Sequence, residues 1–368
     1  MQQDHLTLCV IFYILLKIKG VNFRFFQALM QQKFDFYAFL KNDSQYFKKF
    51  FISEKIVQHF RFFSYKQVRN HLNCLQEQGI TMLTVLDSLY PEALKAIHGY
   101  PLLLYTQGDL SLLNNSSPKL AVVGTRKSSP YGLKVTQRLI SDLIAHDVII
   151  VSGMAAGIDT AAHLATIEAE GKTIAVLGGG FYHIYPRQNL QVFKRIISHG
   201  GLIISEYEPT VEPRRPFFPQ RNRIISGLCC GVLIVQGSQR SGSLITARLG
   251  LEQGRNIYAV PGNIDSPQSY GTNSLIKEGA KLVQNSKDIL EDYPFNNELK
   301  FPDTYTQPSK ADLSLTDLEP EQQLIINILS QEDKNIDQLA IESGFSAAKL
   351  ISLLLSLVVL INLAITSG

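Results

Sequence analysis

The chain of 368 residues has little of what several protein classes require. Charged residues make up only 18% and hydrophobic residues 45%, proportions that exclude disordered, collagen-like and coiled-coil proteins. The four cysteines follow no zinc-ligand or Cys-x-x-Cys spacing, so we expect neither a disulfide framework nor a metal site from them. Reduced thiols are typical of the cytoplasm, which is the location that we expect.

No hydrophobic run is suited to span a membrane. Residues 6–16 are mostly apolar, but a membrane helix needs ~20 residues, and no basic region precedes the run as in a signal peptide. A second apolar run, residues 350–365, is interrupted by Ser352, Ser356 and Asn362. We interpret both runs as buried helix or strand of a soluble protein that makes no membrane contact.

The net charge of +3 is unevenly distributed along the chain. Residues 119–285 contain 18 Lys and Arg against 11 Asp and Glu, whereas residues 286–368 contain 5 against 13. A basic middle and an acidic end indicate an anionic partner for the middle alone. Ordinary variation between domains is the alternative, and charge by itself does not decide between the two.

The first predicted domain, residues 1–75, has apolar residues at helical spacings. Residues 19–22 look like a turn between two short helices. A helix-hairpin-helix that grips phosphate usually has two glycines in this turn, and here only Gly20 is present. We therefore favour a structural helical domain of the SAM or helix-hairpin-helix type, with DNA binding as the alternative.

From Lys119 the pattern changes to alternating strands and helices. The apolar runs are unbroken, as expected for strands covered on both faces, and helical patterns separate them, as at 160–170, 190–198 and 244–253. Such repetition predicts an α/β fold with a parallel, doubly wound sheet and right-handed crossovers. The expected strands are 120–123, 148–151, 173–177, 202–204, 232–235 and 257–260.

The end of the chain has a different composition. Residues 293–312 are rich in Pro, Asn, Asp and Thr, which is typical of a linker. Residues 313–368 follow a pattern of three short helices, the third of them starting at a predicted N-cap, Ser346. We expect a small helix-turn-helix or winged-helix-like domain here.

Polar residues follow the predicted strands at the sheet edge where doubly wound proteins bind ligands. After the first strand come Gly124, Thr125 and Arg126, which suit a phosphate, although a tight turn with a surface arginine fits equally. After the second, Ser152 and Gly153 begin a small-residue loop that opens a helix, the geometry that cradles anions.

The helix that follows Gly153 carries Asp159 and His163, which are four residues apart and could share a helix face as metal ligands. No third ligand is evident nearby, so we favour a cap and a packing histidine and predict no metal. The loop lacks Gly-x-Gly-x-x-Gly, which disfavours a dinucleotide site, and we predict no cofactor.

Two further segments supply candidate ligand contacts. Two phenylalanines precede Arg221, Asn222 and Arg223 at the start of a helix, and arginines with aromatics are the ingredients of a single-strand site. A buried Phe pair with solvated arginines is the alternative. Before a later helix stand hydroxyls, a glycine and another arginine: Arg240, Ser241, Gly242 and Ser243. We find no paired carboxylates, Ser-His-Asp order, P-loop or His/Cys cluster, so we expect no catalysis.

These motifs, in this order, resemble the DNA-processing protein A family (DprA, also called Smf) over most of residues 80–290. The segments that carry the resemblance are Gly124–Arg126, Ser152–Asp159 with Ala162–His163, Tyr185–Pro186, Ser205–Glu206, Phe218–Leu228, Ser241–Ala247, Val260–Gly262 and Gly271–Asn273. Departures from the family pattern include Phe181-Tyr182, Gln236 and Cys229, at positions where the family often has Leu-Asp, Glu and Ser.

The resemblance implies an extended Rossmann-like domain over residues 80–290 that binds single-stranded DNA. It also implies a homodimer, recruitment of a RecA-type recombinase and protection of incoming DNA during natural transformation. By motif, the DNA contacts fall on Arg126 and Lys172, with support from Arg221 and Arg223. For the dimer we expect residues 256–280, whose apolar positions could instead be plain core: Ile257, Tyr258, Leu275 and Ile276.

Two functions other than DNA binding without catalysis are alternatives. An enzyme resembling phosphoribohydrolases of the lysine-decarboxylase-like group would need Pro-Gly-Gly-x-Gly-Thr and a later glutamate. Here Asn263 breaks the motif after Pro261-Gly262, and residues 240–247 supply no glutamate. A nucleotide-sensing regulator with a DNA-reading C-terminal domain is the third alternative.

Overall fold

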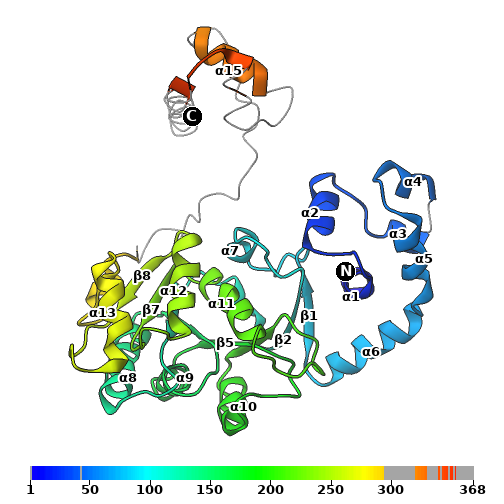
Figure 1. Cartoon of the computed structure of the whole chain (residues 1–368). Coiled ribbons are helices and arrows are strands. Elements are labelled where there is room, and N and C mark those ends of the chain that lie inside the picture. The colour runs from blue at the N-terminus through cyan, green and yellow to red at the C-terminus, as the bar shows by residue number, and fades with distance from the viewer. Residues whose placement is uncertain are drawn as a thin grey trace. The chain divides into compact units, whose positions relative to one another are not determined.

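The structure is a computed structural model that describes residues 2–41, 44–293 and 320–329, together with 339, 342–346, 349–350 and 353. The chain divides into two compact units, residues 1–301 and 302–368 (Figure 1). The first unit holds the predicted helical segment and the sheet. Among the described residues, no helix combines the length and the hydropathy needed to cross a membrane.

A nine-stranded sheet forms the centre of the first unit, in the order β1-β2-β6-β5-β4-β3-β7-β8-β9. All neighbours from β6 to β9 in this order pair in parallel, whereas β1 with β2 and β2 with β6 are antiparallel. The strands are β1 (Thr81–Thr84), β2 (Leu103–Gly108), β3 (Lys119–Val123), β4 (Ile149–Ser152), β5 (Thr173–Leu177), β6 (Leu202–Ser205), β7 (Gly231–Ile234), β8 (Asn256–Ala259) and β9 (Lys281–Leu282).

The predicted doubly wound α/β fold is confirmed, and each of the six expected strands is present within one or two residues. The antiparallel pair β1–β2 at one edge was not predicted. Its strands are short, Thr81–Thr84 and Leu103–Gly108, and the alternation of strand and helix on which the prediction rested begins only at Lys119. A third strand, β9, has two residues and carries no pattern of its own.

Helices cover both faces of the sheet because successive strand residues point to opposite sides. Leu120 and Val122 of β3 belong to a core with α8 (Pro130–Ile144), α9 (Ile158–Glu168) and α14 (Lys287–Leu290). Ala121 and Val123 face the core that includes α11 (Phe217–Gly227) and α12 (Ser243–Glu252). The remaining helices of this part are α7 (Glu92–Lys95), η1 (Leu110–Leu113), η2 (Arg187–Asn189), α10 (Leu190–Ser198), η3 (Pro267–Ser269) and α13 (Tyr270–Lys277).

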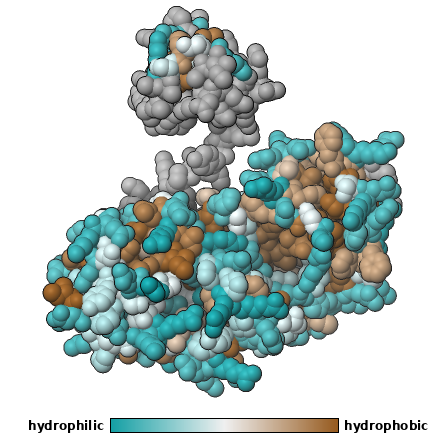
Figure 2. Space-filling model, viewed as in Figure 1, coloured by the Kyte–Doolittle hydropathy of each residue, from teal (hydrophilic) through white to brown (hydrophobic). Residues whose placement is uncertain are grey.

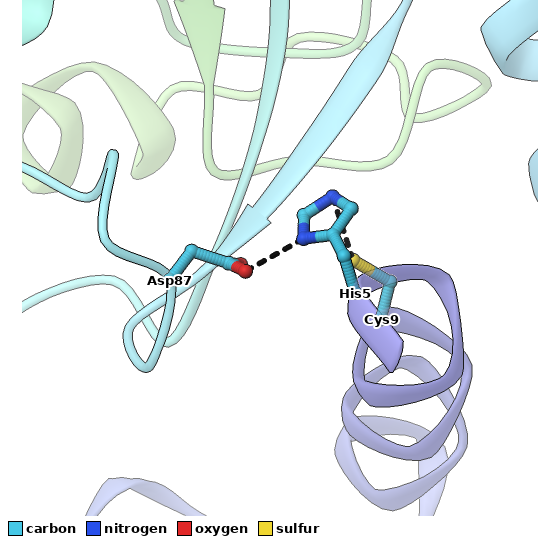
Figure 3. A group of neighbouring side chains, drawn as sticks. All are labelled: His5, Cys9 and Asp87. Atoms are coloured by element: carbon cyan, nitrogen blue, oxygen red, sulfur yellow. Dashed lines mark hydrogen bonds and ion pairs between the residues drawn. The ribbon is translucent and has the colours of Figure 1, made fainter. Parts of the chain in front are cut away.

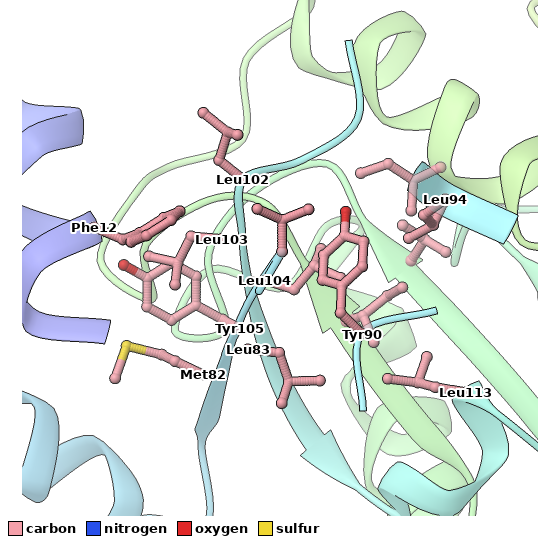
Figure 4. Packing of buried hydrophobic residues seen from close by; sticks show 14 of the residues in the cluster. Phe12, Met82, Leu83, Tyr90, Leu94, Leu102, Leu103, Leu104, Tyr105 and Leu113 are labelled. Carbon is pink, nitrogen blue, oxygen red and sulfur yellow. The ribbon is translucent and has the colours of Figure 1, made fainter. Parts of the chain in front are cut away.

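The N-terminal segment is helical, as predicted, and its first helix packs against the antiparallel edge. Phe12 of α1 lies beside Leu103 and Tyr105 of β2 and near Met82 of β1 (Figure 4). The predicted turn at 19–22 separates α1 from α2, and Gly20 has a φ of 95° there. The helices are α1 (Gln2–Lys17), α2 (Phe23–Gln31), α3 (Ala38–Lys41), α4 (Ser44–Lys49), α5 (Glu54–Phe62) and α6 (Tyr65–Glu77).

Little of the second unit is described. Helix α15 (Pro320–Leu329) buries Ile325, and Leu350 is buried as well. Lys349 N donates to Ser346 Oγ at 3.4 Å, the bond that the predicted N-cap requires. The predicted linker, the winged-helix-like arrangement and most of the apolar run 350–365 lie outside the described residues.

The antiparallel edge can be tested at Gly108, which has a φ of 114° and at which an added Cβ would lie 2.2 Å from the backbone oxygen of Gly201. Strain in this region of φ and the backbone clash predict that Gly108→Ala lowers the free energy of unfolding by about 2 kcal/mol or more. Urea unfolding would measure the loss.

Gly99→Ala is the matched control. Gly99 also has a positive φ, 64°, but an added Cβ there meets no atom within 4 Å. Only the left-handed backbone then costs free energy, about 1 kcal/mol. Equal losses in the two variants would contradict the close pairing of β2 with β6.

Candidate nucleic-acid interface

A pocket of about 570 Å³ opens at the point where the strand order of the sheet reverses. Strand β3 lies between β4 and β7, so the loops after β3 and β7 leave the same edge for opposite faces. Thr125 N donates to Gln236 O at 2.7 Å and joins these two loops. The lining residues are Val123, Gly124, Thr125, Arg126, Ala155, Asp159, Tyr185, Arg215, Phe218, Pro219, Arg221, Asn222, Ser238, Ser241, Gly242, Ser243, Ile245 and Thr246.

The structure brings most of the predicted site residues together in this pocket. They come from three places that are far apart in sequence: the loop after β3, helix α11 and the start of α12 with the loop before it. They are Gly124, Thr125, Arg126, Arg221, Asn222, Ser241, Gly242 and Ser243. Their contact with DNA remains a prediction, but their convergence is now observed.

Two exposed arginines and the half-exposed ring of Tyr185 lie on the pocket lining around Phe218, which is partly buried. The guanidinium carbon of Arg126 lies 5.3 Å from the centre of the Phe218 ring, within the range of a cation–π contact. The ring of Tyr185, whose side chain is half exposed, lies 5.6 Å from that of Phe218. Arg215 is exposed on the same lining. The mouth thus offers positive charge for phosphates and ring faces for stacking.

Arg221 forms part of the pocket wall from a buried position. Only 3% of the residue is exposed, and its Nη1 donates to the backbone oxygens of Gly153 and Val176. Burial lowers the pKa of Arg221 to about 10, against the opposing effect of Asp159. Asp159 is also buried and accepts from Gly153 N at 3.2 Å, and burial raises its pKa. Arg221 therefore joins the ends of β4 and β5 to α11.

Gly153 leaves the space that this guanidinium occupies. A Cβ at Gly153 would lie 2.6 Å from Arg221 Nη2 and 2.8 Å from Asp159 Oδ2. Ser152 is fully buried, and its Oγ donates to Val122 O at 2.7 Å. Neither residue lines the pocket, and both belong to the support beneath it, so their contact with DNA stays a prediction.

His163 of α9 is packed inside the protein. His163 is fully buried, its Nδ1 lies 2.8 Å from Thr173 Oγ1, and burial lowers its pKa to about 3. The expectation of a packing histidine is therefore confirmed. In the part of the chain that the structure describes, only His5, Cys9 and Asp87 gather as a possible metal-binding group.

Three predicted cations do not lie in the pocket. Lys172 precedes β5 and therefore lies at the amino edge of the parallel strands, where its Nζ donates to His199 O at 2.9 Å. Arg223 is held by Glu206 Oε1 at 2.6 Å and by Gly99 O at 3.0 Å. Arg240 is exposed on the loop before α12 but is not part of the lining.

Lys172 lies at the opposite edge of the sheet from Arg126 because it precedes a strand rather than following one. It does not line this pocket, and its contact with DNA remains a prediction. Arg221 and Arg223 separate for a different reason: residues two apart on a helix point in nearly opposite directions. Three residues of the pocket lining were not predicted as site residues from the sequence: Arg215, Tyr185 and Ser238. The Arg214-Arg215 pair directly before the two phenylalanines was the signal available for the first of these.

The loop that carries Arg215 is attached to the N-terminal helices through Glu208. Tyr13 of α1 donates to Glu208 Oε1 at 2.7 Å, and Lys17 Nζ pairs with Oε2. Burial would raise the pKa of Glu208, but the hydrogen bonds from Lys17 and Tyr13 lower it below its ordinary value. The carboxylate thus joins α1 to the segment between β6 and α11.

Fold and site together define a class: a doubly wound α/β protein with a cationic, aromatic-rimmed pocket at the switch point, suited to a phosphate-bearing polymer. The family described as DNA recombination-mediator protein A matches residues 81–294, more than half of the chain. The chain belongs to this family.

Relatives and solved structures agree with that assignment. The chain is 43% identical over 244 residues to the DNA processing protein DprA of Bacillus subtilis, covering 66% of this chain and 80% of the relative. It is 38% identical over 304 residues to protein Smf of Escherichia coli, covering 82% and 79%.

Among structures, the chain is similar to DprA from Streptococcus pneumoniae, with a TM-score of 0.59 and 39% identity over 65% of this chain and 82% of that one. A second similar structure, of DNA processing protein A from Helicobacter pylori, is described by its single-stranded DNA binding mode. It has a TM-score of 0.52 and 32% identity, over 58% of this chain and 97% of that one.

The attachment through Glu208 predicts a pH-dependent stability difference. Because the pKa of Glu208 is lowered in the folded state, its contribution is present above its ordinary value of 4.5 and is lost as the pH falls through the folded value. Glu208→Gln should therefore unfold about 1 kcal/mol more easily than the unchanged protein at pH 7. Urea unfolding from pH 7 to about pH 3 should show this difference disappear.

Glu212→Gln provides the control. Glu212 is an exposed carboxylate in the same loop, so its removal should change stability little at any pH. A Glu208→Gln difference that persists at low pH would show that the charge of the carboxylate is not what stabilises the loop.

Proposed function

We propose that this protein binds single-stranded DNA in the switch-point pocket, protects it, and helps to load a RecA-type recombinase. The setting is DNA uptake by natural transformation, and recombination, in the cytoplasm. The observation that carries the proposal is the arrangement of Arg126 and Arg215 with the rings of Tyr185 and Phe218 around one pocket. Membership of the recombination-mediator family and the single-stranded DNA binding of the Helicobacter pylori relative support it.

The shape of the site favours single strands over duplex. Exposed ring faces gain stacking energy only from bases that are unpaired, about 1–3 kcal/mol for each base. The arginines of the pocket contact phosphates without reading sequence, so tolerance of sequence follows.

A phosphoribohydrolase-like enzyme is the alternative, and the pocket supports it less well. Of the described lining residues, Asp159 alone carries a carboxylate, and it is buried and accepts from Gly153 N. A general base must reach the proton that it removes, and a buried carboxylate already held by Gly153 N and close to Arg221 suits that role poorly. We propose binding without catalysis and without a cofactor.

The DNA site is tested by salt-dependent binding of oligo-dT to the full-length protein. Arg126→Ala and Arg215→Ala should each weaken binding by about 1 kcal/mol or more, roughly fivefold, and lower the dependence of log K on log salt by about 0.7 for each lost phosphate contact. Tyr185→Ala should weaken binding with the salt dependence unchanged, because stacking involves no counterion.

Lys172→Ala is the matched control, since it removes an equal charge at the opposite edge of the sheet. It should leave affinity and salt dependence nearly as they are. An effect of Lys172→Ala as large as that of Arg126→Ala would move the DNA path away from the pocket. Equal competition by duplex of the same length would refute the preference for single strands.

We also propose a homodimer, which would let two pockets share one strand and so make the second contact intramolecular. Within the predicted segment 256–280, Tyr258 is fully buried and Ile257 and Leu275 pack on the core, so these are core positions. The exposed apolar side chains there are Ile264 at 78% and Tyr270 at 46%. Figure 2 shows that hydrophobic side chains also gather near α12 and over the N-terminal helices.

Ile264→Asp should convert a dimer into a monomer in sedimentation at micromolar protein, because a charge cannot be buried without a partner at an isologous contact. Phe62→Asp is the control, since Phe62 is 89% exposed on α5 outside this segment. If Phe62→Asp rather than Ile264→Asp produced the monomer, the interface would lie on the helical region.

For the recombinase, we propose the acidic C-terminal part as the contact. Residues 286–368 contain 13 Asp and Glu against 5 Lys and Arg, a balance that disfavours DNA and suits a basic protein surface.

A further inference from the structure

Three side chains with different metal-binding groups meet where helix α1 approaches the sheet. His5 and Cys9 come from α1, and Asp87 comes from the turn after β1 (Figure 3). His5 Nδ1 lies 2.6 Å from Asp87 Oδ1, and Cys9 Sγ lies 3.8 Å from His5 Nε2. One ligand atom of each residue lies within 4.8 Å of the others.

The local structure prepares each of these groups. His5 and Cys9 are four residues apart on a helix and therefore share one face. Thr84 holds the other oxygen of Asp87, because its N and Oγ1 donate to Asp87 Oδ2 at 2.5 and 2.8 Å. Oδ1 is thereby left facing His5. Such an outer contact, which orients a ligand oxygen, is typical of metal sites in proteins.

We propose that His5, Cys9 and Asp87 form a binding site for Zn²⁺. Thiolate, imidazole and carboxylate are the three groups that bind Zn²⁺, at about 2.0–2.3 Å, whereas Mg²⁺ and Ca²⁺ prefer oxygen alone. Ligand atoms around a tetrahedral ion lie roughly 3–4 Å apart. Asp87 and Cys9 now contact different nitrogens of the His5 ring, so the ring must turn to present one nitrogen to an ion that the other two residues share. Binding releases to solvent both the thiol proton of Cys9 and the imidazole proton that His5 shares with Asp87.

Space for entry and for a fourth ligand adjoins the cluster. A pocket of about 250 Å³ is lined by His5 and Cys9, together with Arg69 and Gln76 of α6. The His5 side chain is 36% exposed, which gives an ion a path from solvent. Thiolate and carboxylate together neutralise a divalent ion, and the positive charge of Arg69 on the pocket wall favours water or a small anion as the fourth ligand.

The order Cys9–His5–Asp87 also resembles that of a cysteine nucleophile, its base and an orienting carboxylate. The burial of Cys9 argues against that role. None of Cys9 is exposed, and its Sγ donates to Met82 O at 3.8 Å. A buried thiol can hold a metal ion that enters past His5, but it cannot attack a large substrate.

The site would join elements that are distant in the chain. His5 and Asp87 are 82 residues apart, and α1 packs on the antiparallel edge strands. An ion bound here would hold the start of α1 against the turn after β1. We therefore expect zinc to raise the melting temperature of the protein in addition to binding stoichiometrically.

Titration of reduced, metal-free, full-length protein with Co²⁺ tests the proposal, because tetrahedral cobalt has visible bands and a thiolate ligand adds a charge-transfer band. We expect one Co²⁺ per chain, displaced by Zn²⁺, with both band types present. His5→Gln, Asp87→Asn and Cys9→Ser should each weaken binding by about 100-fold or more, and Cys9→Ser should abolish the charge-transfer band. Cys74→Ser, which removes an exposed cysteine of α6, should change neither.

A graded variant separates metal binding from folding. Thr84→Val keeps the shape of the side chain but removes the hydroxyl that holds Asp87, so it should weaken binding about 10–100-fold. His5→Gln at its partly exposed position should fold even if Cys9→Ser does not. No cobalt binding by the unchanged protein, or binding unaffected by His5→Gln and Asp87→Asn, overturns the proposal.

Discussion

The buried guanidinium of Arg221 is the contact on which the pocket depends. It takes the charge of an arginine out of water, a cost that is offset only because Nη1 donates to the carbonyls of Gly153 and Val176 and because the carboxylate of Asp159 is close. These partners lie at the ends of β4 and β5, whereas Arg221 belongs to α11. One side chain therefore sets the distance between two strand ends and the helix that carries Phe218. The absence of a Cβ at Gly153 is a condition for this arrangement.

The exposed arginines of the pocket, Arg126 and Arg215, differ from the buried Arg221 in the contacts that they make. Arg126 is exposed, and its contact with Phe218 is a cation–π contact rather than an ion pair. A cation resting on a ring is not neutralised, so it keeps its attraction for phosphate while its position is restricted. The arginines therefore have different roles. Arg221 donates its hydrogen bonds to backbone carbonyls and forms part of the pocket wall, whereas Arg126 and Arg215 supply accessible positive charge at the rim.

How much of this followed from the sequence depends on the scale considered. Unbroken apolar runs predicted the parallel strands from Lys119 to Val260, and the rule that ligands bind at the carboxyl edge predicted which loops converge. Side-chain direction was not predictable in the same way. Lys172 stands one residue before β5 and therefore lies at the edge of the sheet opposite the pocket. Arg223 contacts Glu206 and Gly99 because residues two apart on a helix point in different directions, so it does not follow Arg221 into the pocket wall. The contacts of Glu208 with α1 and of Asp87 with His5 join segments that are far apart in sequence. A local sequence pattern therefore could not predict them.

The contacts of α1 bear on the role of the N-terminal helices. Tyr13 and Lys17 hold Glu208 at the start of the segment between β6 and α11, and Arg221 holds the end of the same segment from within α11. Arg215 lies between these two fixed points, at the rim of the pocket. A long loop that is restrained at both ends has fewer conformations in the unbound protein, so it loses less conformational entropy when it binds a ligand. On this argument the helical region contributes to ligand binding in the pocket by positioning a loop. The single glycine of its 19–22 turn agrees with a structural role rather than with a second phosphate site.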